Sequence, residues 1–233
     1  MNDDLGALRA HLGIPEDERD AKWRHRLYDL IEIVPLAPRD PPTFYGPDGF
    51  PYHALDVPFS AFDGEVTIPE LAEAATERGY GIAIEPHGDE AAWVFTCGDL
   101  VTRRAFGGYE FPRIGFMPGA APTFRAVLKE TQKMQVLAPS EGTLPAYVRG
   151  HLHDYFTYML GIPHPGVLAL VSPDQEPREQ LVFRVARDDF RDEEAFESAI
   201  AGLTWFLPRH LVVSILPTDL VDALDDAFIP LAA

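Results

Sequence analysis

The two histidines His151 and His153 are the first residues in this chain whose type and spacing suggest metal binding. Residues two apart share one face of a strand, but in a helix they point about 200° apart around the axis. The segment around them has a helical pattern, and only His164 lies near enough in sequence to add to the three or four ligands that zinc needs. We therefore expect no bound metal and no cofactor, with both histidines at a surface or an interface.

The single cysteine, Cys97, follows the apolar segment Ala92–Thr96. A thiol becomes a nucleophile when a histidine or another cation favours its thiolate, and the sequence does not place His53 or His87 beside it. A buried, unreactive thiol is the simpler expectation. Since no serine lies in a Gly-x-Ser-x-Gly motif either, we predict no catalytic residue.

A run of carboxylates near residue 190 raises the alternative of a divalent cation. The spacing of an EF-hand loop and its turn glycine are both missing. Acidic side chains at the start of a helix stabilise its unpaired N–H groups, which explains most of the run. The carboxylates concerned are Asp188, Asp189, Asp192, Glu193, Glu194 and Glu197.

Three arginines, Arg103, Arg104 and Arg113, are the candidate contacts for an anion or an acidic partner. Arginine binds carboxylate and phosphate through two parallel hydrogen bonds, which suits such a role. The alternative is that these side chains pair with the acidic modules on either side. Neither Gly107–Gly108 nor Gly46–Gly49 forms a nucleotide-binding loop, so the sequence does not support nucleotide binding.

Helices and strands alternate in the first half of the chain. We predict helices at Asp3–Leu12, Pro15–Ile33 and from Ile68 after the capping pair Thr67 and Glu70, a surface loop over Pro38–Pro51, and strands at Tyr52–Val57, Gly81–Glu85 and Ala92–Thr96. The loop prediction depends on the many prolines and glycines, which disfavour regular structure.

The second half has the order strand, helix, strand, strand, helix, strand, which matches the split βαβ pattern of ferredoxin-like domains. The predicted strands are Lys133–Ala138, Gly166–Ser172, Gln180–Arg187 and His210–Leu216, and the predicted helices are Thr143–Leu160, Asp192–Phe206 and a short last helix capped by Thr218. We expect a four-stranded antiparallel sheet with two helices on one face. Because this scaffold carries many unrelated activities, it predicts no function.

The predicted fold class is therefore α+β in two modules. An N-terminal α+β module spans residues 1–104, a basic connector rich in glycine and proline spans 105–129, and a ferredoxin-like module with an extra C-terminal helix spans 130–233. Charge follows a similar division, since residues 1–100 carry 20 acids and 7 bases, whereas residues 101–137 carry 2 acids and 6 bases.

The net charge of -18 argues against binding to nucleic acid or to an anionic membrane surface, because both repel an acidic protein. No apolar run approaches the roughly 20 residues that span a bilayer. With one cysteine the chain forms no internal disulfide, and its first residues lack the pattern of a secretion signal. We therefore expect a cytoplasmic protein.

Three local patterns resemble the SseB-like family, named for enhanced serine sensitivity. They are Leu27–Leu30 leading to Pro35–Leu36, the turn Gly79–Ile82 into a strand, and Val136–Glu141 at the start of the second module. The resemblance implies a bacterial cytoplasmic accessory protein and carries over no catalytic residues.

Our leading hypothesis is a non-enzymatic protein that acts through contacts with a protein partner. The competing hypothesis is a small-molecule enzyme with a site between the two modules, using His151, His153, Cys97 or the arginines. An enzyme is expected to have a concave pocket in which titratable groups converge, whereas a binding protein is expected to copurify with its partner.

Overall fold

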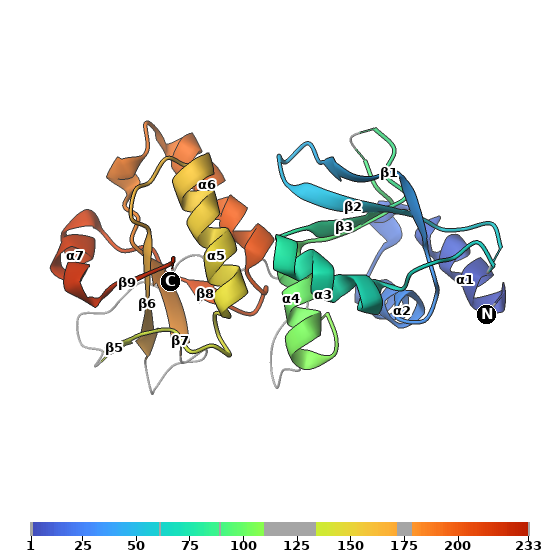
Figure 1. Cartoon of the computed structure of the whole chain (residues 1–233), viewed down its shortest axis with the longest axis horizontal. Coiled ribbons are helices and arrows are strands. Elements are labelled where there is room, and N and C mark those ends of the chain that lie inside the picture. Colours follow the sequence, from blue (N-terminus) through green and yellow to red (C-terminus); the bar gives the residue numbers. More distant parts are fainter. Residues whose placement is uncertain (1, 61, 89, 110–133, 172–178, 233) are drawn as a thin grey trace. The chain divides into compact units, whose positions relative to one another are not determined.

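The computed structural model has an α+β fold with two compact units, residues 1–119 and 120–233 (Figure 1). It describes residues 2–60, 62–88, 90–109, 134–171 and 179–232. Each unit has its own mixed β-sheet with helices packed against it. In the described residues, no helix combines the length and the apolar character needed to cross a membrane.

The first unit contains a four-stranded sheet in the order β1-β2-β3-β4. Its helices are α1 (Asn2–Leu12), α2 (Ala21–Ile31), α3 (Ile68–Arg78) and α4 (Cys97–Phe106), and its strands are β1 (Ala37–Tyr45), β2 (Pro51–Asp56), β3 (Gly81–Ile84) and β4 (Trp93–Phe95). Strand β2 pairs antiparallel with β1 and parallel with β3, while β3 and β4 form an antiparallel hairpin. The parallel pair requires a crossover, and α3 supplies it.

Strand β1 overturns our prediction of a loop over Pro38–Pro51. Residues 38–45 of that segment belong to β1, which pairs with β2 at Pro38 and again from Thr43 to Tyr45, with a shift of the pairing register between Pro38 and Thr43. Strand β1 lies at the edge of the sheet, where a residue without an N–H group can face outward and break no ladder hydrogen bond. The loop prediction was wrong because the prolines of this segment are tolerated in an edge strand.

Helix α3 begins where its sequence predicts. The Thr67 hydroxyl accepts a hydrogen bond from the Glu70 backbone N–H, and the Glu70 carboxylate accepts one from the Thr67 backbone N–H. Gly79 ends the helix with φ of 71°, in the left-handed region where glycine is favoured. These contacts join residues no more than four positions apart, so they can be predicted from local sequence.

Helix α4 was not predicted. Thr96 and Asp99 form a second reciprocal capping box, so Cys97 begins a helix instead of ending a strand. The helix continues to Phe106, past the residue at which we ended the first module.

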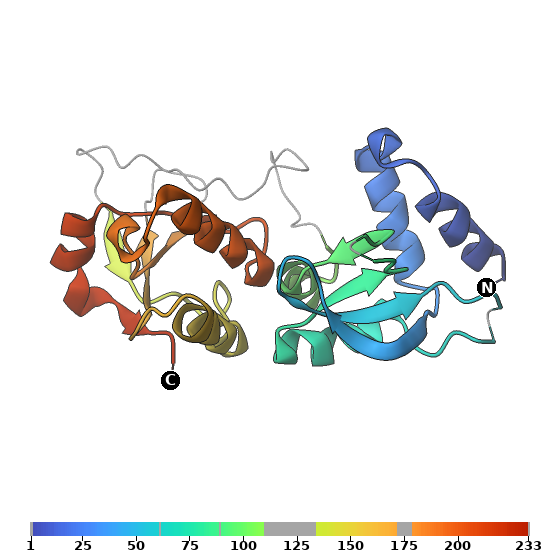
Figure 2. The same ribbon diagram turned by 90° about the horizontal axis from the view of Figure 1, so that it is seen from above.

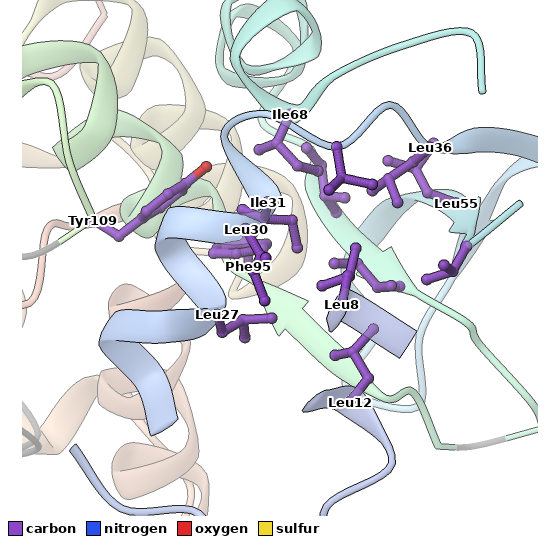
Figure 3. Close-up of a cluster of buried hydrophobic side chains, with 14 of the residues drawn as sticks. Leu8, Leu12, Leu27, Leu30, Ile31, Leu36, Leu55, Ile68, Phe95 and Tyr109 are labelled. Carbon is purple, nitrogen blue, oxygen red and sulfur yellow. The ribbon is translucent and has the colours of Figure 1, made fainter. Parts of the chain in front are cut away.

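A single apolar cluster joins the sheet of the first unit to its helices. Figure 2 shows α1 and α2 beside the strands of the first unit, and the same cluster includes Ile68, Ala72 and Ala75 of α3. Figure 3 shows how Leu8 of α1, Leu30 of α2 and Phe95 of β4 meet in the cluster, with Tyr109 at its border. Burial of such side chains contributes roughly 1.5–3 kcal/mol each.

The second unit contains the strands β5 (Gln135–Leu137), β6 (Gly166–Val171), β7 (Glu179–Phe183), β8 (Val212–Val213) and β9 (Ile229–Pro230) and the helices α5 (Ala146–Asp154), α6 (Glu193–Phe206) and α7 (Thr218–Ala223). Helix α5 continues as a π-helix over Tyr155–Met159. Thr218 is the first residue of α7 and not its side-chain cap, since its hydroxyl donates to Asp188.

The strand order of this unit differs from the split βαβ arrangement that we predicted. The order is β5-β6-β7-β8, with β9 beside β6, and β7 and β8 are parallel neighbours joined through α6. In a split βαβ motif, a third strand separates the two strands that a helix connects. Both edges of a sheet offer the same unpaired N–H and C=O groups, so a strand pattern alone does not determine which edge the next strand joins.

Helices cover both faces of this sheet. Helices α5 and α6 contact each other, and Tyr155 of the π-helix that continues α5 lies against Phe206 of α6. Phe156 of the same π-helix lies 5.4 Å from Phe183 of β7 between ring centroids. On the opposite face, Leu168 and Val221 belong to a second apolar cluster that includes α7. The side chains of β6 and β7 alternate between the two faces of the sheet, and both faces are apolar, as expected for strands buried on both sides.

Candidate functional site

Two phenylalanines on one loop of the first unit are almost completely exposed. The loop spans residues 57–66, which we call the aromatic loop, and it joins β2 to the cap of α3. Phe59 is 94% exposed and Phe62 is 91% exposed. Single exposed apolar residues are common, but two large aromatic rings this exposed on one loop are typical of a surface that binds a partner.

Arg9 of α1 holds the first end of the aromatic loop. Its Nη2 atom donates hydrogen bonds to the carbonyl oxygens of Pro58, at 2.6 Å, and Val57, at 3.3 Å. The guanidinium also lies 5.3 Å from the centre of the Phe59 ring, within the range of a cation–π interaction. Val57 and Pro58 are buried, so the exposed part of the loop starts abruptly at Phe59.

The second end is tied to the segment that precedes β1. Leu36 donates its backbone N–H to the carbonyl of Val66 at 2.7 Å and accepts hydrogen bonds from Glu65 and Val66. A Cβ atom added at Gly64 would lie 2.7 Å from the carbonyl oxygen of Pro35, so only glycine allows this approach without movement of the backbone. The loop therefore has a fixed exit as well as a fixed entry.

Between these ends the backbone makes a local turn. The N–H of Asp63 donates to the carbonyl of Ser60 at 3.0 Å, and the N–H of Phe62 donates to the Ser60 hydroxyl at 3.2 Å. Serine side chains commonly stabilise turns in this way. Among the described residues of the loop, Phe62 and Asp63 are therefore both tied to Ser60, the residue that follows Phe59.

The sequence segment that contains the loop is strongly acidic, although Arg9 of α1 contacts the start of the loop. Residues 51–100 contain ten Asp and Glu and one base, Arg78, which gives a net charge of -9 for this part of the sequence. Asp63 and Glu65 of the loop itself are exposed. An apolar centre with an acidic border suits a partner surface of opposite charge.

The sequence analysis did not single out Phe59 and Phe62. The available signal was a Phe-Ser-x-Phe pattern between a strand and a helix cap, where a loop is expected. That pattern does not distinguish rings that fold back onto a core from rings that stay exposed.

Two of the three predicted anion-contact arginines, Arg103 and Arg104, lie in ion pairs within their own unit. Arg103 donates to both carboxylate oxygens of Glu32, at 2.7 and 2.8 Å. Arg104 approaches Glu73 at 3.3 Å and Glu77 at 3.7 Å, in exposed pairs that contribute little. Arg113 lies outside the described residues. The two described guanidinium groups thus have the intramolecular carboxylate partners that our alternative interpretation expected.

Cys97 has surroundings that disfavour a nucleophile. It is completely buried at the start of α4, and burial, together with the negative charge of Asp99, raises the pKa of its thiol to about 12. His53, one of the two histidines considered as its partner, lies against the Tyr80 ring, with ring centroids 5.2 Å apart and the ring planes tilted by 45°. Burial and the charge of Arg78 lower the pKa of His53.

The histidines of the second unit lie in different surroundings. His151 stacks on Phe206 of α6, whereas His153 contacts the Asp154 carboxylate at 3.2 Å and the edge of the Tyr158 ring. Across the part of the chain that the structure describes, no three His, Cys, Asp or Glu side chains come together as a metal site would require.

Several carboxylates of the acidic run have local structural roles. Asp192 caps α6 by accepting a hydrogen bond from Ala195 N–H at 2.8 Å, and this bond lowers the pKa of Asp192. Asp189 accepts from Ala186 N–H, and Glu193 pairs with Arg187. These contacts agree with an acidic helix start.

Comparison of the chain with protein-family models, with curated proteins and with solved structures found no match.

Proposed function

We propose that the protein is a cytoplasmic accessory protein that binds a protein partner through the aromatic loop. The observation that carries this proposal is the near-complete exposure of Phe59 and Phe62 on a loop whose two ends are both anchored. Aromatic side chains dominate the energy of many interfaces because one ring buries a large area at a small cost in conformational entropy.

The chemistry of the partner follows from the loop and its border. An apolar pocket would receive the two rings, and lysine or arginine side chains around the pocket would face Asp63 and Glu65. Because the backbone of the loop is held by Arg9 and Leu36, little ordering entropy is lost on binding. Association should be fast at low ionic strength and slower in high salt.

Self-association through the aromatic loop is a less favourable arrangement. Two copies would bring surfaces of the same negative sign together, and each chain carries a net charge of -18. Like charges placed opposite each other across an interface cost free energy. We therefore propose a basic partner and not a second copy of the chain.

Site-specific photocrosslinking tests the proposal. A benzophenone amino acid is placed at position 59 or 62 of the full chain, cells are irradiated, and crosslinked proteins are identified by mass spectrometry. The matched control is the same group at Tyr45, an aromatic residue that is 75% exposed. Tyr45 pairs with Pro51, at the opposite end of β2 from the loop.

We expect a basic protein to crosslink from positions 59 and 62 but not from position 45. The double variant Phe59→Ser and Phe62→Ser should keep the circular dichroism spectrum and lose the partner. The proposal fails if the same proteins are recovered equally from all three positions, or if the double variant retains its partner. A dimer in sedimentation that the double variant abolishes would show that the loop serves self-association.

The resemblance to the SseB-like family is compatible with an accessory role of this kind and stays a proposal. The alternative of an enzyme with a site between the two modules likewise stays a prediction.

A further inference from the structure

The second unit contains a pocket of about 150 Å³ that the proposed partner-binding function does not use. It lies where the start of β6, the residue after β7, the strand β9 and helix α5 come together. The residues that line it are His153, His164, Pro165, Gly166, Arg184, Phe228, Pro230 and Ala232.

The charged and polar side chains that line this pocket are all bases. They are the imidazoles of His153 and His164 and the guanidinium of Arg184, and no lining residue is acidic. A neutral imidazole already has one N–H donor, and a guanidinium has five. Such a group of donors is unexpected in a chain with a net charge of -18 and fits an anionic ligand.

Neighbouring carboxylates position two of these bases. Arg184 contacts Asp225 through Nη2 at 2.5 Å, and His153 contacts Asp154 through Nδ1 at 3.2 Å. The contact with Asp225 involves one of the guanidinium nitrogens, which leaves other N–H groups of Arg184 for a ligand. The backbone N–H of Arg184 donates to the carbonyl of Gly166 at 2.8 Å, so the base is attached directly to the sheet.

One of the lining residues, His164, has an unusual backbone conformation. His164 has φ of 54°, in the left-handed region that a residue with a side chain rarely occupies. Such strain is often retained at binding sites. A Cβ atom added at Gly166 would lie 2.9 Å from the Cβ of Phe228, so glycine permits the close approach that forms the wall.

The remaining wall is apolar and small. Pro165, Phe228 and Pro230 contribute carbon surface, and β9 is held in place by its pairing with β6 and by the hydrogen bond from Leu231 N–H to the Pro165 carbonyl. An apolar cavity of about 150 Å³ accepts a molecule the size of benzene. The size and the chemistry of the walls therefore suit a ligand with one anionic end and a short apolar body.

We propose that this pocket binds a small organic acid, with its carboxylate on Arg184 and the two histidines and its apolar part against Phe228 and the prolines. The site lies within the second unit and is separate from the aromatic loop of the first. The two proposals can therefore be tested independently of each other.

Titration of the full chain with sodium benzoate, followed by NMR of the backbone amides, tests the proposal. Benzoate should saturate the shifts of residues 153, 164 and 184, whereas benzyl alcohol, which has the same ring without the charge, should bind at least ten-fold more weakly. Inorganic phosphate, which has the charge without the apolar body, should also bind at least ten-fold more weakly.

Two variants and one control assign the site. Arg184→Gln should weaken benzoate binding at least ten-fold. His164→Gly should weaken it several-fold while keeping the fold, because glycine is favoured at this backbone conformation. The matched control is Arg191→Gln, which replaces an arginine of the same unit that is 82% exposed.

An unchanged affinity in Arg184→Gln or in His164→Gly would overturn the proposal. If benzyl alcohol binds as tightly as benzoate, the pocket recognises only the apolar ring. If phosphate binds as tightly as benzoate or more tightly, the pocket is a site for inorganic anions. If Arg184→Gln does not fold, His164→Gly decides alone.

Discussion

Arg103 and Glu32 form a two-pronged ion pair across 71 positions of the sequence, with Nε and Nη2 of the arginine donating to the two carboxylate oxygens. Glu32 directly follows α2, and Arg103 lies in the last turn of α4, so the pair links these two helices. Burial by itself would raise the pKa of Glu32, but the hydrogen bonds from Arg103, the proximity of the Tyr109 hydroxyl and the charge of Arg103 lower it overall. Burial and the charge of Glu32 raise the pKa of Tyr109.

The first prediction concerns this pair. Glu32→Gln should destabilise the first unit by about 1 kcal/mol at pH 7, the size of one hydrogen bond to a charged group after allowance for partial exposure. The pKa of Glu32 is lowered from 4.5 on folding, so its contribution is fully present above pH 4.5 and is lost as the pH falls through the folded value. The difference in the free energy of unfolding between the variant and the wild type, measured with urea, should decrease as the pH falls from 7 to 3.

The matched control for that prediction is Glu73→Gln, at a carboxylate that is 72% exposed and contacts Arg104. Its effect should stay within about 0.5 kcal/mol because exposed pairs are weak. A Glu32→Gln effect that is equally small, or that does not depend on pH, would show that the pair does not link the helices energetically.

The second prediction concerns thiol reactivity. Since burial and Asp99 raise the pKa of Cys97 to about 12, the folded protein should react very slowly with a disulfide reagent at pH 8. The rate should rise steeply in urea as the unit unfolds. Tyr45→Cys in a Cys97→Ala background places a thiol at an exposed position and provides the fast reference. Rapid modification of Cys97 in the native protein would contradict its placement.

The third prediction concerns Gly202 of α6. Glycine to alanine in a helix usually stabilises by about 1 kcal/mol, but a Cβ at this position would overlap the hydroxyl and Cζ of Tyr155. Overpacking costs about 1–3 kcal/mol, so Gly202→Ala should be destabilising in thermal or urea unfolding. Tyr155→Leu should remove most of the penalty, which a double-mutant cycle measures.

Gly150 of α5 provides a control for which we expect the opposite change in stability. A Cβ added there meets no atom within 4 Å, so Gly150→Ala should stabilise by up to about 1 kcal/mol. If both glycine replacements change stability in the same direction, the packing of α5 against α6 is not as described.

The fourth prediction concerns the support of the aromatic loop. Arg9→Ala removes the hydrogen bonds to the carbonyls of Val57 and Pro58, so the amides of Phe62 and Asp63 should exchange with solvent several-fold faster. The partner that crosslinks from position 59 should dissociate faster. Arg9→Lys keeps one cationic donor and should fall between wild type and Arg9→Ala. Unchanged exchange in Arg9→Ala would show that the loop is held by other contacts.

Local sequence determined the features of this protein that depend on near neighbours. The capping pair of Thr67 and Glu70 and the start of α6 next to Asp192 each involve residues a few positions apart, and the predictions that helices begin there are confirmed. The two predicted strands that became β3 and β4 are confirmed for the same reason. Apolar periodicity marked these elements because a helix or a strand repeats its buried positions at a constant interval.

Tertiary structure decided which elements became neighbours and which side chains stayed exposed. The parallel pairing of β7 with β8, the strand formed by the proline-rich segment and the exposure of Phe59 all depend on partners distant in sequence. The same holds for the pocket, where His153 and Arg184 come together only because the strands between them pair. A residue pattern encodes the tendency to be buried, whereas the free energy of the whole chain selects the surface against which each residue is buried.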